Sequence, residues 1–120
     1  MKALVCEAYG PVENLVYRDM PDPVPGAGEI RVVIEAIGVN FPDGLLVEGK
    51  YQAKPQVPFM PGGEFAGQVA ALGPGASGFA VGDRVLGWNV GRGAYAEQIA
   101  VPAGELFPLP ASMSMDQGAA

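Results

Sequence analysis

Few side chains in this chain of 120 residues are able to act as nucleophiles, bases or metal ligands. The chain contains no histidine and one cysteine, Cys6. Without an imidazole, the serine and cysteine nucleophiles that rely on a histidine base are excluded. A zinc site needs about three or four ligands, mostly from cysteine and histidine, so no metal is expected. A lone cysteine cannot form a disulfide within the chain, and it indicates a cytoplasmic protein.

The polar side chains that remain for chemistry stand beside glycines and prolines. Asn40 precedes a Phe-Pro-Asp run, Tyr51 follows Gly49-Lys50, and Glu64 follows two glycines. Asn40 offers an amide that both donates and accepts, and Tyr51 offers a phenol that could donate to a carbonyl oxygen. Each also has an ordinary structural interpretation. Asn40 would cap a helix, Tyr51 would pack against a loop, and Glu64 would be a solvated or ion-paired turn residue.

Trp88 is the only tryptophan and stands next to the glycine-rich segment 89–93. An aromatic side chain in that place fits the wall of a binding pocket and fits the hydrophobic core equally well. The sequence leaves both interpretations open.

The segment Gly73-Pro74-Gly75-Ala76-Ser77-Gly78 matches the G-x-G-x-x-G pattern of dinucleotide-binding loops. That pattern binds a pyrophosphate only where the glycines lead from a strand into a helix N-terminus, whose free N–H groups hold the phosphates. Here residues 79–85 follow, with another glycine and a further β-like run. They leave no room for a helix, so the pattern predicts a turn.

Composition and charge limit the class of protein further. The formal net charge is −6 and the seven basic residues are scattered, which argues against nucleic acid as a partner. There is no run of about 18 apolar residues, so no membrane span is expected. The 18 glycines and 12 prolines stand between short apolar runs, as turns do in a mainly β domain. An apolar fraction of 49% supports one domain with its own core.

Short β-strands must position most of these groups. The alternation of apolar and polar residues predicts the strongest strand at 29–39, with Ile30, Val32 and Ile34 on one face. The expected strands are 2–8, 14–18, 29–39, 64–72, 83–88, 94–101 and 106–110. Short strands at this spacing predict a barrel or a sandwich.

Two short helices are also expected. Residues 40–49 break the alternation, with Asn40 or Phe41 as the cap, Pro42 in the first turn and Gly49 at the end. The run 114–117 has the S-x-x-Q form of a capping box, which begins a helix. The chain stops at Ala120, and a helix start without a helix body favours a fragment of a longer protein over a frayed tail.

Five segments, in this order, resemble the N-terminal, GroES-like catalytic domain of the medium-chain dehydrogenase/reductase superfamily. They are Gly38-Val39-Asn40-Phe41-Pro42-Asp43, Gly49-Lys50-Tyr51, Pro61-Gly62-Gly63-Glu64-Phe65-Ala66-Gly67, Val81-Gly82-Asp83-Arg84-Val85 and Gly93-Ala94-Tyr95-Ala96-Glu97. Together they span nearly the whole chain. The resemblance implies a mainly β fold, a GroES-like partly open β-barrel with one or two short helices.

Departures from the zinc-binding members point to one branch of this superfamily. Zinc alcohol dehydrogenases carry a cysteine ligand where this chain has Asn40 and a histidine where it has Gly63, and their four-cysteine lobe is absent here. The chain resembles the zinc-independent, NADPH:quinone oxidoreductase-like branch. The resemblance implies hydride transfer from NADPH to a quinone, or to the C=C bond of an α,β-unsaturated carbonyl.

The resemblance also implies roles for individual residues. Asn40 and Tyr51 would contact the cofactor, and Tyr51 is also the candidate catalytic residue, as a donor to the carbonyl oxygen of the substrate. Leu45, Gly63 and Trp88 would line the substrate pocket. Some relatives carry a tyrosine where Leu45 stands, so the choice between quinone and enone and the identity of the proton donor both stay open. NADP versus NAD stays open as well.

Members of this family continue into a Rossmann domain that holds most of the NADPH and usually makes a homodimer. Residues 1–120 contain no such domain, so the chain alone is expected to be inactive. One alternative is a stand-alone GroES-like β-barrel that acts as a binding or assembly module, and another is an enzyme half that joins a separately encoded cofactor domain. A βαβ unit with a glycine-rich turn encoded after Ala120 would support the reductase, and a stop codon would support the module.

Overall fold

The computed structural model describes residues 1–89 and 93–120. The strands are β1 (Lys2–Val5), β2 (Val16–Asp19), β3 (Glu29–Gly38), β4 (Glu64–Leu72), β5 (Arg84–Trp88), β6 (Gln98–Pro102) and β7 (Leu106–Pro108). The helices are α1 (Phe41–Glu48) and α2 (Met115–Ala119), with 3₁₀ turns η1 (Val12–Asn14) and η2 (Ala103–Glu105). Within the described residues, no helix is long and apolar enough to cross a membrane.

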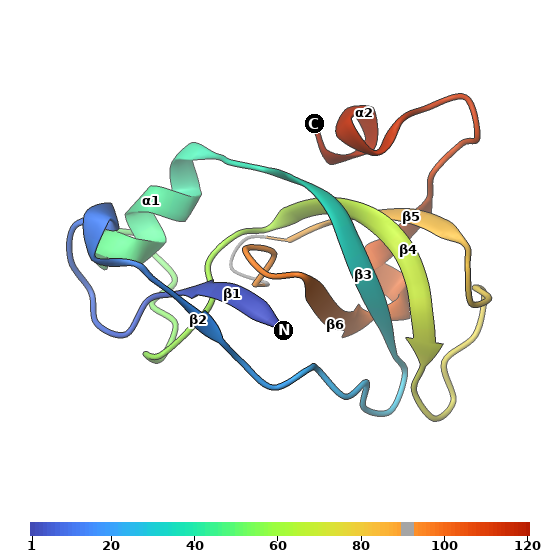
Figure 1. The fold of residues 1–120 in the computed structure, drawn as a ribbon, viewed down its shortest axis with the longest axis horizontal. Helices are drawn as coiled ribbons and strands as arrows, with labels where there is room; N and C mark the ends of the chain where they lie inside the picture. Colours follow the sequence, from blue (N-terminus) through green and yellow to red (C-terminus); the bar gives the residue numbers. More distant parts are fainter. Residues whose placement is uncertain (90–92) are drawn as a thin grey trace.

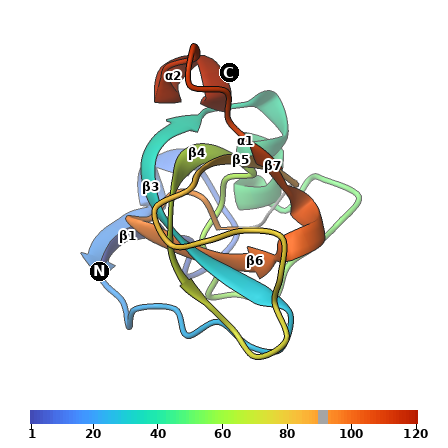
Figure 2. The same cartoon turned by 90° about the vertical axis from the view of Figure 1, so that its right-hand side faces the viewer.

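Five of the strands form one antiparallel sheet, in the order β6-β3-β4-β5-β7, and β1 pairs separately with β2. The larger sheet curls around its inner face without closing into a barrel (Figures 1 and 2). The predicted fold class, mainly β with a partly open barrel and short helices, is confirmed.

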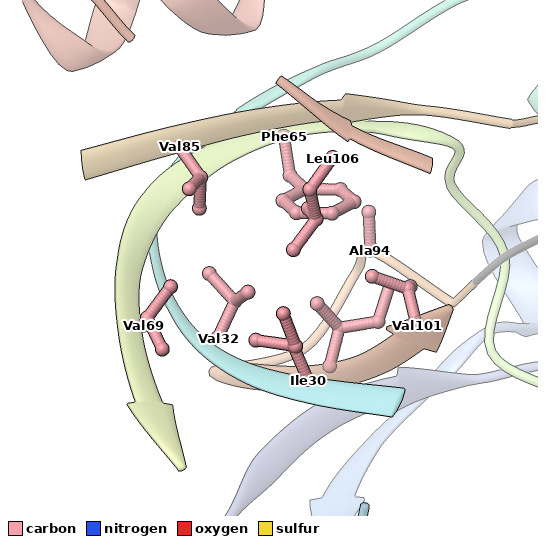
Figure 3. Close-up of a cluster of buried hydrophobic side chains, with 9 residues drawn as sticks. Ile30, Val32, Phe65, Val69, Val85, Ala94, Val101 and Leu106 are labelled. Carbon is pink, nitrogen blue, oxygen red and sulfur yellow. The ribbon is translucent and has the colours of Figure 1, made fainter. Parts of the chain in front are cut away.

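The hydrophobic core lies inside this curl, where side chains from neighbouring strands point toward one another (Figure 3). Its buried members are Ile30, Val32, Phe65, Val69, Val85, Ala94, Ile99, Val101 and Leu106. Ile30 and Val32 are fully buried, as the alternation in the third strand predicts. Burial of each large apolar side chain stabilises the fold by roughly 1.5–3 kcal/mol.

Several strand boundaries differ from the sequence prediction, most of them by one or two residues; the last strand, for example, ends at Pro108 and not at residue 110. Three of the differences have a clear cause in hydrogen bonding. The first strand ends at Val5, not residue 8, because the backbone of Cys6 pairs with Phe59. The second begins at Val16 because residues 12–14 form η1. The strand predicted at 94–101 begins only at Gln98, since the backbone N–H groups of residues 94 and 95 donate to carbonyls at 61 and 62.

The predicted turn and helices are confirmed. The segment 73–78 is a turn between β4 and β5, with positive φ at Gly75 and Gly78 and no helix after it. Helix α1 begins after Asn40 and ends at Gly49, whose φ of 72° is left-handed. At α2, Ser114 Oγ accepts from the backbone N of Gln117 at 3.1 Å, and Gln117 Oε1 accepts from the backbone N of Ser114 at 2.9 Å.

Candidate functional site

Asn40 lies between the end of β3 and the first residue of α1. Its carbonyl oxygen accepts from the backbone N of Asp43 at 3.0 Å, and its side-chain Nδ2 donates to Oε2 of Glu64 at 2.6 Å. Glu64 begins β4, where it is paired with Gly38 of β3 and with Trp88 of β5. The register of the sheet thus brings Glu64 to Asn40, a contact that the sequence analysis missed.

Gly38 leaves the space that the carboxyl group of Glu64 occupies. A Cβ at position 38 would lie 2.2 Å from Oε2 of Glu64 and 2.8 Å from the carbonyl oxygen of Ala119. Both distances are shorter than nonbonded atoms adopt. A side chain at position 38 would therefore displace Glu64 from Asn40.

Asp43, at the start of α1, is a buried acid that bonds two other parts of the site. It is 3% exposed, and its Oδ2 accepts from the backbone N of Asn40 at 3.0 Å and from the hydroxyl of Tyr95 at 2.9 Å. Burial of a carboxylate costs free energy unless hydrogen bonds compensate, and the positive end of the helix dipole also favours its charge. The three-residue spacing from Asn40 was a signal for the first bond, but nothing in the sequence signals the bond to Tyr95.

Tyr95 is held rigidly against this carboxylate. Its backbone N donates to the carbonyl of Pro61 at 3.0 Å, and its carbonyl accepts from the N–H of Leu4 at 2.9 Å. Its ring packs over Gly62, where a Cβ would lie 2.5 Å from Cδ1 of the ring. Burial, and then the hydrogen bond to Asp43 and the negative charge of that residue, raise the pKa of Tyr95 well above its usual range.

We expect Tyr95→Phe to lower the free energy of unfolding by about 1 kcal/mol at pH 7, because one hydrogen bond is lost. Native Tyr95 stays protonated at pH values where an unfolded tyrosine, with a pKa of about 10, has lost its proton. The unfolded state then binds fewer protons, so the stability due to Tyr95 is complete below pH of about 10 and is lost as the pH rises above it. Urea unfolding at several alkaline pH values should therefore show that the free energy of unfolding falls more steeply with pH for the parent than for Tyr95→Phe. Tyr17→Phe, at an exposed position, should keep the parent's slope, and equal slopes for all three proteins would refute this role of Tyr95.

Two cavities meet at Asn40 and Asp43. The larger, of about 600 Å³, is mostly apolar and is lined by Val12, Leu15, Val39, Asn40, Phe41, Asp43, Gly44, Leu45, Val47, Glu48 and Tyr95. The smaller, of about 150 Å³, is lined by Asn40, Pro42, Asp43, Gly63 and Trp88. Asn40 is therefore placed to contact molecules in both cavities.

The structure brings most of the predicted site residues together. Asn40, Gly63 and Trp88 line the smaller cavity, and Leu45 lines the larger one beside Asn40. Trp88 is 63% exposed, so it forms a wall and not part of the core, while residues 90–92 of the segment after it lie outside the described residues. Tyr51 lies beyond the C-terminal end of α1, a helix of eight residues and about 12 Å that begins after Asn40, and it is not among the described residues that line either cavity.

The two positions at which the resemblance would place zinc ligands, Asn40 and Gly63, line the same small cavity. A neutral amide and a residue without a side chain stand there. In residues 1–89 and 93–120, no three histidine, cysteine, aspartate or glutamate side chains are grouped to hold a metal ion.

The chain is similar to known proteins over nearly its whole length. The model of the alcohol dehydrogenase GroES-like domain family matches residues 26–111. The quinone oxidoreductase-like protein 2 homolog of Nematostella vectensis is 39% identical over 119 residues, which cover 99% of this chain and 30% of that protein.

Two solved structures share the fold over nearly the whole chain. The human synaptic vesicle membrane protein VAT-1 homolog-like protein has a TM-score of 0.93 at 32% identity, covering 99% of this chain and 38% of that one. The Escherichia coli quinone oxidoreductase, solved in complex with NADPH, has a TM-score of 0.90 at 30% identity, covering 99% of this chain and 36% of that one.

This chain spans about a third of the length of these three proteins. The matched family model covers most of the chain, and the fold is the same from β1 to α2. The chain therefore belongs to the alcohol dehydrogenase GroES-like domain family.

Proposed function

We propose that this chain forms the catalytic-domain side of a zinc-independent, NADPH-dependent oxidoreductase that transfers hydride to a quinone or to the C=C bond of an α,β-unsaturated carbonyl. The position of Asn40 where the two cavities meet is the observation that carries the proposal. Relatives named as quinone oxidoreductases, one of them solved with NADPH, support the reaction class and the cofactor.

The smaller cavity suits the reactive end of the cofactor. Asn40 supplies an amide held by Glu64, Gly63 lines the cavity without a side chain, and Trp88 supplies an aromatic wall. These residues would hold the nicotinamide end of NADPH, which when bound would supply the hydride. The role of the protein is then to hold the hydride donor and the hydride acceptor close together and to exclude water.

The larger cavity suits an apolar electron acceptor. Val39, Phe41 and Leu45 give it apolar walls, so a quinone or enone would gain roughly 25 cal/mol for each Å² of apolar surface buried. The hydroxyl of Tyr95 donates to Asp43, so it is not offered to a substrate carbonyl. The proton that completes the reduction would then come from another donor, and Tyr51 stays a prediction for that role.

We expect Asn40→Ala to lower kcat/KM for NADPH about tenfold in the full-length gene product. One lost hydrogen bond, together with a less well held cofactor, accounts for a loss of this size. The assay pairs NADPH or NADH with a panel of quinones and enones. Asn14→Ala, which changes an exposed asparagine outside both cavity linings, is the matched control and should leave kcat/KM unchanged.

A parent that reduces none of these acceptors would contradict the proposed reaction, and would favour the alternative of a binding or assembly module. Parental kcat/KM in Asn40→Ala would contradict the role of Asn40. We further propose that most of the NADPH is held by a Rossmann domain outside residues 1–120, which also makes a homodimer. In the same assay, the isolated 120-residue chain is accordingly expected to show no turnover.

A further inference from the structure

We infer that Glu64 is a positioning residue for Asn40: it holds the Asn40 amide in the orientation in which it meets the cofactor. This inference rests on the proposed function. The observation that supports the positioning role of Glu64 is the 2.6 Å hydrogen bond from Nδ2 of Asn40 to Oε2 of Glu64. A carboxylate only accepts hydrogen bonds, so this contact admits one orientation of the amide, with nitrogen toward Glu64. Such a bond to an ionised acceptor is shorter and stronger than one between neutral groups.

Glu64 is itself held by the sheet. It is the first residue of β4, with Gly38 of β3 on one side and Trp88 of β5 on the other, so its backbone is tied to two strands. Its carboxyl group occupies the space above Gly38, where a Cβ would lie 2.2 Å from Oε2. A side chain mounted on a paired strand and confined in this way can orient a partner far better than a loop residue can.

Asn40 is held at a second point by a different part of the chain. Its backbone N donates to Oδ2 of Asp43, which in turn accepts from Tyr95. The backbone of Asn40 is thus fixed through Asp43 and its side chain through Glu64. Loss of the Glu64 carboxyl group should free the amide of Asn40 while the start of α1 stays in place.

The test is a double-mutant cycle on NADPH binding, titrated through the fluorescence of the cofactor in the full-length gene product. We expect Glu64→Ala to weaken the dissociation constant about tenfold. Glu64→Gln, whose amide oxygen still accepts from Asn40, should bind within about threefold of the parent. In an Asn40→Ala background, Glu64→Ala should change the dissociation constant by less than about twofold, because the residue through which Glu64 acts is gone.

Two controls keep the result interpretable. Gln68→Ala, at an exposed position on the same strand, should bind NADPH as the parent does. Glu64→Asp keeps the charge but is one methylene shorter, and it replaces Glu64→Ala in the cycle if the alanine variant does not fold.

An equal loss of NADPH affinity on Glu64→Ala in the parent and in Asn40→Ala would overturn the positioning role. Removal of a purely structural residue weakens binding by the same factor with or without Asn40. In that case NADPH binding by the parent would still support the proposed function. A parent that fails to bind NADPH would overturn the proposed function and this inference with it.

Discussion

Asp43→Ala is expected to lower the free energy of unfolding by about 3 kcal/mol and to weaken NADPH binding. The substitution leaves the hydroxyl of Tyr95 and the backbone N–H of Asn40 without their shared acceptor. Each unsatisfied donor costs about 1–3 kcal/mol where water does not replace the bond, and loss of a negative charge near the N-terminus of α1 costs about 0.3–1 kcal/mol more. Urea denaturation at pH 7 measures the total loss in the free energy of unfolding.

Two variants separate these causes. Asp43→Asn keeps an oxygen able to accept both bonds, so it should cost less than Asp43→Ala. Asp116→Ala removes an exposed acid from the first turn of α2, where only the dipole contribution is lost, and should cost less than about 1 kcal/mol.

The pKa of Tyr95 gives an independent reading of the same contact. In Asp43→Ala the hydrogen bond and the negative charge disappear while burial remains, so the pKa should fall part of the way toward the usual value of about 10. Titration of the tyrosine absorbance in the ultraviolet measures the pKa of Tyr95 in the parent and in Asp43→Ala. Parental stability together with an unchanged pKa would show that Asp43 does not hold this part of the site.

Gly67→Ala is expected to destabilise the protein by about 3 kcal/mol or more. Gly67 of β4 faces β3 so closely that a Cβ would lie 2.0 Å from the carbonyl oxygen of Val33 and 3.1 Å from Cα of Ile34. Both atoms belong to the backbone of a central strand, which cannot rotate away as a side chain can. The pair β3 and β4 would have to separate, and overpacking of this kind typically costs 1–3 kcal/mol, occasionally more.

The matched control for Gly67→Ala is a glycine substitution that should stabilise the protein. Gly44 lies in α1, and a Cβ there meets nothing within 4 Å. Gly44→Ala should raise the free energy of unfolding by about 0.5–1 kcal/mol, since alanine loses less backbone entropy in a helix. Chemical unfolding of both variants beside the parent provides the test. Equal stabilities for Gly67→Ala and the parent would mean that the close approach of β3 and β4 yields easily.

Much of the fold could be predicted because it follows local rules. The alternation through Ile30 and Val32 sets the buried face of β3, and left-handed glycines such as Gly49 and Gly75 mark where a helix and a turn end. The predicted strand boundaries were wrong where the backbone pairs with a distant segment, as at Cys6, which forms an isolated β-bridge with Phe59. Hydrogen bonds between segments far apart in the chain leave no local pattern.

The candidate site divides in the same way. The sequence alone determined which chemistry is available: no histidine, one cysteine, an amide at Asn40, and no side chain at Gly63. Only the tertiary structure decided which of these groups meet. Asn40 and Glu64 are 24 residues apart, and Asp43 and Tyr95 are 52 apart. Their contacts depend on the register of β3 against β4 and on the backbone pairing of residues 61–62 with 93–95, which long-range packing sets and local residue preferences do not.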